Sequence, residues 1–144
     1  MKFIIPFLIL FYILLCFTAT AQNVELTIKG IRSTKGQLLI GVFKDNESFQ
    51  KEKAYKNLKF DKTAVVNGTL TVKFDLEPGV IGFSLLDDEN SNGKMDYNFI
   101  GYPLEGFGFS NYYHRGFTKP NFDSFKFNLT KTLDQKIVIE IRYM

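Results

Sequence analysis

Residues Thr63–Phe74 read T-A-V-V-N-G-T-L-T-V-K-F, and this short stretch is the clearest indicator of fold class in the chain. Two runs rich in β-branched residues flank Asn67-Gly68. Asparagine and glycine both tolerate a positive φ, which the two-residue turn of a β-hairpin requires. The stretch therefore predicts a hairpin with one strand over Thr63–Val66 and the other over Thr69–Phe74.

Strand patterns continue on both sides of this hairpin. Val24–Lys29 alternates apolar and polar residues, which is the period of a half-buried strand. A turn rich in Ser, Lys and Gly separates it from the apolar run Gln37–Phe43, so we expect these two segments to pair as a second hairpin. A long polar connection follows, with room for one helical turn over Glu47–Lys53. Further strands are expected over Val80–Leu86, Ser124–Leu129 and Gln135–Tyr143.

The whole pattern indicates an all-β fold. No segment has a convincing helical period, and about seven short strands alternate with turn signals. We therefore expect a single antiparallel β-sandwich of Greek-key type over residues 22–144. The segment 98–121 is rich in glycine and aromatic residues but has no clean period, and no strand is predicted there.

Residues 1–21 have the pattern of a cleaved signal peptide. Lys2 supplies a positive charge, an apolar run follows, and Ala-Thr-Ala at residues 19–21 fits the small-x-small site of signal peptidase. The apolar run Phe3–Phe17 is shorter than the ~20 residues that span a bilayer, which disfavours an anchor. The two leucines before Cys16 disfavour lipidation. We expect a secreted or periplasmic protein with no membrane span in the mature chain.

The expected mature chain is close to neutral. Loss of Lys2 lowers the net charge from +3 to +2, and so small a charge does not steer a protein to nucleic acid. We therefore expect no nucleic-acid partner. Lysines recur between residues 51 and 62 and alternate with apolar and acidic residues, which we interpret as a solvated face.

The segment Asp87–Asp96, D-D-E-N-S-N-G-K-M-D, is the strongest indication of a ligand. Counted from Asp88, its oxygen-bearing residues fall at the positions that bind calcium in the first half of an EF-hand loop. Gly93 permits the sharp bend that brings them together. The expected ligands are the side chains of Asp88, Asn90, Asn92 and Asp96 and the backbone carbonyl of Lys94.

The loop departs from an EF-hand in its second half. Phe99 stands where the EF-hand has a bidentate glutamate, and no helix is expected to follow. Asp87 and Glu105 are candidates to complete the shell, together with water. We expect a structural Ca²⁺ ion, bound weakly at about 10⁻⁴–10⁻³ M. The alternative is an Asx-turn loop that its own hydrogen bonds hold without a metal.

A series of motifs makes the chain similar to a known family. The motifs are Leu76-x-Pro78-Gly79, Asp88-x-Asn90-x-Asn92-Gly93-x-x-Asp96, Gly101-x-Pro103-x-Glu105-Gly106-x-Gly108-Phe109-Ser110-Asn111 and Pro120-x-Phe122. In order and spacing they resemble the DUF2141 family of exported bacterial proteins of unknown function. This resemblance implies a β-sandwich outside the cytoplasm and brings no activity with it. The Pro-Gly turn also looks like turns in transthyretin-like (prealbumin-like) sandwiches, which is an analogy of fold alone.

Aromatic residues after the acidic loop form a candidate ligand surface. The candidates are Tyr102, Phe107, Phe109, Tyr112 and Tyr113. Such rings either stack on a sugar or a protein partner, or cover one end of the sandwich. No catalytic constellation is convincing, so we predict a non-enzymatic binding or accessory module with an unknown protein or carbohydrate partner in the cell envelope. The alternatives are a hydrolase of extracellular glycans that pairs Glu105 with Asp87 or Asp96, and a purely structural domain.

Overall fold

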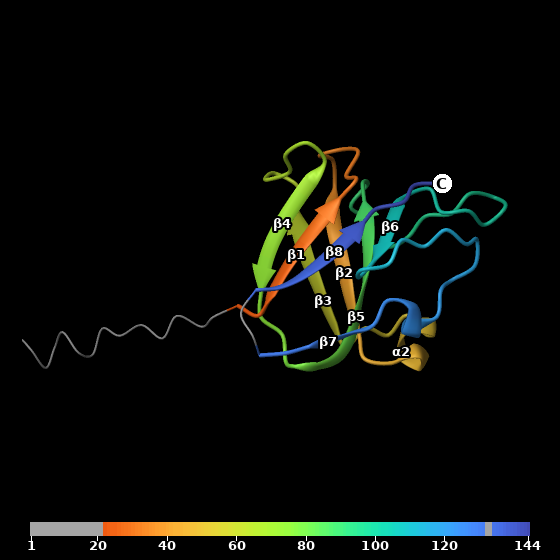
Figure 1. The fold of residues 1–144 in the computed structure, drawn as a ribbon. Coiled ribbons are helices and arrows are strands. Elements are labelled where there is room, and N and C mark those ends of the chain that lie inside the picture. The colour runs from red at the N-terminus through yellow and green to blue at the C-terminus, as the bar shows by residue number, and fades with distance from the viewer. Residues whose placement is uncertain (1–21, 132–133) are drawn as a thin grey trace, which may run out of the picture.

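Two β-sheets pack face to face in the computed structural model, which describes residues 22–131 and 134–144 (Figure 1). The predicted signal peptide, residues 1–21, lies outside the described residues. The smaller sheet has the order β4-β1-β8, and the larger has the order β3-β2-β5-β6 with β7 also paired to β5. The elements are β1 (Val24–Lys29), β2 (Gln37–Phe43), α2 (Asn46–Gln50), β3 (Lys56–Asp61), β4 (Thr69–Phe74), β5 (Gly79–Asp88), β6 (Gly106–Phe109), η1 (Phe122–Ser124), β7 (Phe127–Leu129) and β8 (Gln135–Glu140). The predicted all-β, two-sheet architecture is confirmed.

The core lies between the sheets and follows from the period-two pattern of the strands. Alternate residues of β1, such as Leu26, and of β8, such as Ile139, face inward from the smaller sheet. Alternate residues of β2 and β5, such as Ile40 and Phe83, face them from the larger sheet. Each is at most 1 % exposed, so the alternation in sequence correctly identifies the buried face.

The pairing of β1 differs from the expectation. We expected β1 and β2 to form a hairpin, but they lie in different sheets. Instead β1 pairs antiparallel with β4 and parallel with β8, so the expected all-antiparallel arrangement is also wrong for one pair. Alternation shows which side of a strand is buried, but not which strand lies beside it. The link from β1 to β2 crosses between sheets, and Gly30, with a φ of +81°, begins that crossing.

The predicted Asn67-Gly68 turn is present. Both residues have positive φ, 50° and 70°, and Val66 and Thr69 exchange two backbone hydrogen bonds of 3.0 Å across it. Its first arm is shorter than expected, however, because Val66 makes only one isolated bridge. The strand that precedes it is β3, which belongs to the opposite sheet and was not predicted.

A second, aromatic core closes one end of the sandwich. Phe49 of the short helix α2 meets Phe109 and Phe125 edge to face, with ring centroids 5.9 Å and 4.8 Å apart. The helix lies within the connection where one helical turn was expected, and Asp45 caps it by accepting a hydrogen bond of 2.7 Å from Ser48 N. No helix among residues 22–131 and 134–144 is long and apolar enough to cross a membrane.

Candidate functional site

The acidic loop begins where β5 ends, and Asp88 organises it. This carboxylate is fully buried. Its Oδ1 accepts a hydrogen bond from Asn92 N (3.0 Å), and its Oδ2 accepts from Gly93 N (2.9 Å) and Gln37 Nε2 (2.7 Å). A β2 side chain and two loop amides therefore fix Asp88, and the chain bends around it through Ser91 and Gly93, whose φ values are positive.

The other predicted ligands of the loop converge on Asp96. Asn90 Nδ2 and Asn92 Nδ2 each donate a hydrogen bond of 2.7 Å to Asp96 Oδ2. Their amide oxygens accept from the backbone, Asn90 Oδ1 from Asn92 N and Asn92 Oδ1 from Lys94 N, both at 3.0 Å. These are Asx-turn bonds, which hold the loop in the manner of the metal-free alternative. A cation at this point would replace the two amide groups as the partner of Asp96.

Glu105 reaches this loop from the start of β6. Its Oε1 accepts a hydrogen bond of 3.1 Å from Glu89 N, and Leu104 N donates to Asp96 O at 2.8 Å. The residue is 5 % exposed, and its Oε2 has no hydrogen-bond partner among the described residues. Burial, and then the nearby carboxylates of Asp88 and Asp96, raise the pKa of Glu105.

An open pocket lies beside the loop and Glu105. Glu89, Asn90, Asp96, Tyr97, Leu104 and Glu105 line an open pocket of about 410 Å³. A buried carboxylate oxygen without a partner is costly, and a metal ion would satisfy it. In the described part of the chain no group of three or more His, Cys, Asp or Glu side chains could hold a metal alone. Amide oxygens, backbone oxygens or water would therefore have to complete the shell.

Asp87, the other candidate for that shell, is already paired. It is fully buried and forms an ion pair with Lys62 Nζ, while Tyr143 Oη donates to its Oδ2 at 2.5 Å. Lys62 Nζ also donates to Ser33 O (3.1 Å) and Lys35 O (2.7 Å). Burial and the bond to Asp87 raise the pKa of Tyr143. Asp87 thus stabilises the base of the loop.

Sequence reasoning missed this network, because Lys62 was assigned to a solvated face. It is in fact 2 % exposed, whereas Lys51, Lys53, Lys56 and Lys59 are exposed as expected. Nothing in the local pattern separates Lys62 from these other lysines. Only the fold brings it to Asp87.

The fold exposes some residues of the candidate aromatic surface and buries others. Tyr102 and Tyr113 are 40 % and 41 % exposed. Phe109 is buried in the aromatic core, and Phe107 and Tyr112 pack against that core, so their rings mainly cover the end of the sandwich.

A different set of exposed apolar residues lies beside the acidic loop. Phe99 is 98 % exposed on a turn that Asn98 builds, since Asn98 Oδ1 accepts from Ile100 N (3.0 Å) and Tyr102 N (2.9 Å). The segment between β5 and β6 that carries this turn projects from the sheets (Figure 1). We call this surface the apolar face: Tyr97, Phe99, Ile100, Tyr102, Leu104 and Phe117.

Comparison with known proteins supports the resemblance in the motifs. A family model described as an uncharacterised protein conserved in bacteria, DUF2141, matches residues 26–137. The chain belongs to the DUF2141 family. The match runs from β1 into β8 and includes the acidic loop and the apolar face. No curated protein and no solved structure gives a significant match to this DUF2141 protein.

Proposed function

We propose that this DUF2141 protein is an exported, non-enzymatic binding module whose apolar face contacts a partner. One observation carries the proposal: Phe99 and Ile100 are 98 % and 60 % exposed on a turn that hydrogen bonds hold in place. Exposed apolar residues that gather on a surface mark an interaction site, and here Tyr102, Leu104 and Phe117 line one pocket while Tyr97 and Leu104 line another. The partner is a protein or carbohydrate of the cell envelope, because the signal-peptide pattern directs the chain there.

The proposal includes a structural calcium ion in the acidic loop. Asp88, Asp96 and the unpartnered Oε2 of Glu105 support it, with Asn90, Asn92 and the carbonyl of Lys94 as neutral donors. The hydrogen bond from Leu104 N to Asp96 O joins the ion site to the apolar face. The ion would supply positive charge among crowded carboxylates and so fix the segment that carries the face.

The Greek-key, transthyretin-like arrangement is part of the same proposal. Support comes from the strand order, in which β1 and β8 lie parallel and side by side in the smaller sheet while β2, β3, β5 and β6 form the larger. In this order the acidic loop and residues 97–104 of the apolar face lie between β5 and β6 of the larger sheet.

A capture experiment tests the binding role. The mature protein is used to pull partners from the native envelope, with calcium or with chelator, beside a Phe99→Ser/Ile100→Ser variant. The control is Val66→Ser, which removes an apolar side chain that is 67 % exposed outside the apolar face. We expect a partner that wild type and control retain in calcium and the double variant loses. Equal capture by all three proteins would contradict the proposal.

One observation favours a second candidate, the carboxylate-based hydrolase of glycans. Asp96 and Glu105 line the same open pocket, and a raised pKa suits Glu105 to act as a general acid. The first proposal ranks higher because it rests on the exposed side chains of Phe99 and Ile100 and needs no pair of catalytic carboxylates. Release of reducing sugar from envelope glycans by wild type, and its loss in Glu105→Gln, would establish the hydrolase instead.

A further inference from the structure

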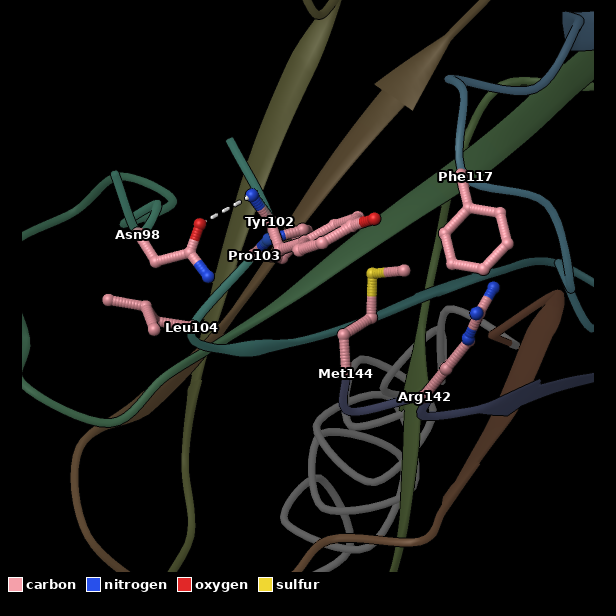
Figure 2. A pocket seen from close by; sticks show the side chains of 7 residues that line it. All are labelled: Asn98, Tyr102, Pro103, Leu104, Phe117, Arg142 and Met144. Carbon is pink, nitrogen blue, oxygen red and sulfur yellow. Dashed lines mark hydrogen bonds between the residues drawn. The ribbon is translucent and has the colours of Figure 1, made fainter. Parts of the chain in front are cut away.

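A second pocket lies between the apolar face and the C-terminal segment, and no role has been assigned to it. It is open, has a volume of about 350 Å³, and is lined by Asn98, Tyr102, Pro103, Leu104, Phe117, Arg142 and Met144 (Figure 2). That volume is at the small end of the range for ligand pockets, roughly 300–1,000 Å³. A ligand that fills it must therefore be small.

The walls of this pocket are mostly apolar. The rings of Tyr102 and Phe117 stand with centroids 6.0 Å apart and planes inclined by 53°. Figure 2 shows the Met144 side chain rising between Tyr102 and Arg142. Phe117 and Met144 are 77 % and 44 % exposed, so the pocket offers uncovered apolar surface that a ligand would remove from water.

Arg142 has the only charged side chain in this lining, and hydrogen bonds hold it in place. Its backbone exchanges two hydrogen bonds with Phe107, of 2.8 Å and 3.0 Å. Its Nη1 donates to His114 O (2.9 Å) and Gly116 O (2.8 Å), and its Cζ lies 5.8 Å from the centroid of the Phe117 ring. The guanidinium group is thus fixed at one edge and placed beside an aromatic wall.

Among the described residues, the other edge of this guanidinium group has no hydrogen-bond partner. Within residues 22–131 and 134–144, no carboxylate pairs with Arg142, and no acceptor bonds to its Nε or Nη2. These two nitrogens form the planar fork that donates two parallel hydrogen bonds to a carboxylate. The one charged side chain of this mostly apolar lining is thus a cation that can pair with one anionic group of a ligand.

From this geometry we infer that the pocket binds a small molecule with an apolar or aromatic body and one carboxylate group. The carboxylate pairs with the Nε–Nη2 edge of Arg142, and the body lies against Tyr102, Phe117 and Met144. The inference goes beyond the proposed function, because it adds a small-molecule ligand to the protein or carbohydrate partner. It does not depend on calcium.

Phenylacetate tests this inference, with the neutral phenylacetamide as its matched partner. Each is titrated into the mature protein while backbone and side-chain NMR signals are followed. We expect saturable shifts from phenylacetate around Tyr102, Phe117 and Arg142. We also expect phenylacetamide to bind at least about tenfold more weakly, because it cannot form the charged hydrogen bonds.

Two pocket variants, Arg142→Gln and Phe117→Ala, and one control, Arg115→Gln, assign the site. Arg142→Gln should weaken phenylacetate binding at least about tenfold, while Arg115→Gln, an exposed arginine outside the pocket, should leave it unchanged. Phe117→Ala removes an exposed ring and should weaken both probes. This variant keeps the test valid if Arg142→Gln disturbs the segment that Arg142 Nη1 holds.

Three results would overturn the inference: equal affinity for acid and amide, shifts confined to another surface, or no saturable binding by either probe. The titrations are repeated in calcium and in chelator, beside thermal unfolding of the same samples. Failure of phenylacetate to bind, with a thermal shift by calcium preserved, rejects this inference and leaves the ion site standing. Binding of phenylacetate without any effect of calcium rejects the ion site alone.

Discussion

At the scale of single residues, the acidic loop rests on a buried ion pair. The side chains of Lys62 and Asp87 are both fully buried. Tyr143 donates a further hydrogen bond to Asp87, and Lys62 donates to two backbone carbonyls. A buried pair is a poor source of net stability, because both charges lose their hydration. Breaking it is nevertheless costly, since the charge that remains has no partner.

Lys62→Met should therefore destabilise the protein strongly. Removal of the ammonium group leaves the buried Asp87 without its counter-charge, which costs about 3–5 kcal/mol. The control Lys59→Met changes an exposed lysine of β3 and should stay within about 0.5 kcal/mol of wild type. Urea unfolding at neutral pH measures both. A loss below about 1 kcal/mol in Lys62→Met would show that the pair is dispensable.

Glu105 should make stability depend on pH in the absence of calcium. Its pKa in the folded protein is raised above the ordinary value of 4.5, so the folded state favours the protonated form. The stability it contributes is present below that ordinary value and is lost as the pH rises through the higher folded pKa.

The measurement is urea unfolding in chelator across this pH range. Wild type should lose stability as the pH rises, and Glu105→Gln should lose less, whereas the exposed Glu140→Gln should follow wild type. In calcium the wild-type loss of stability with rising pH should shrink, because the ion binds the ionised carboxylate. Identical pH profiles for wild type and Glu105→Gln would contradict the assigned environment.

At the scale of elements, β5 determines the layout of the larger sheet. It pairs with β2 over Gly82–Asp88, with β7 over Gly79–Ile81 and with β6 over Ser84–Asp87. Gly82 lies at the break between β7 and β6. A Cβ at this position would lie 2.7–2.9 Å from the rings of Phe125 and Phe122.

Gly82→Ala should consequently cost about 1–3 kcal/mol, the usual effect of overpacking. Val80→Ala, at a half-exposed position of the same strand, should cost less than about 1 kcal/mol. Chemical unfolding of the two variants compares them directly. Wild-type stability in Gly82→Ala would mean that the aromatic core can shift to admit a methyl group.

These elements also show how far the sequence predicts the structure. Alternation identifies β1, β7 and β8, apolar runs identify β2 and β5, and the Asn67-Gly68 turn with its β-branched flanks identifies β4. These patterns miss β3, whose lysines resemble a polar connection, and β6, where Gly106 and Gly108 interrupt the pattern. The glycines are there because a Cβ would collide with Tyr143 and Ile139, and only the tertiary structure shows those neighbours.

The sequence predicts the candidate site about as well as it predicts the fold. Spacing brings together Asp88, Asn90, Asn92 and Asp96, since their contacts are local. Glu105 was also expected at this loop, and its carboxylate does reach it. The roles of Lys62 and Tyr143 depend on contacts between distant parts of the chain. The neighbouring sequence of Lys62 and of Tyr143 predicts neither role. The sequence also does not show which of the aromatic rings are buried and which are exposed.

At the scale of the whole molecule, the sandwich gathers the notable features at one end. The acidic loop leaves β5, the apolar face follows it, and Arg142 approaches from beyond β8 through its bridge to Phe107 in β6. The segment between β5 and β6 carries the proposed ion site and the apolar face except Phe117. This arrangement supports a recognition role for the projecting segment.

Thermal unfolding in calcium is the most direct test of the central claim, that the Asp88–Asp96 loop and Glu105 hold a cation. If the ion binds only the folded state and its Kd is about a tenth of the calcium concentration, it adds about 1.4 kcal/mol to the free energy of unfolding. This raises the unfolding midpoint by roughly 5 °C. Wild type should show this rise in millimolar calcium, while Asp96→Asn and Glu105→Gln should lose most of it and Glu140→Gln should keep it. An unchanged wild-type midpoint, or an equal rise in Glu105→Gln, would contradict the claim.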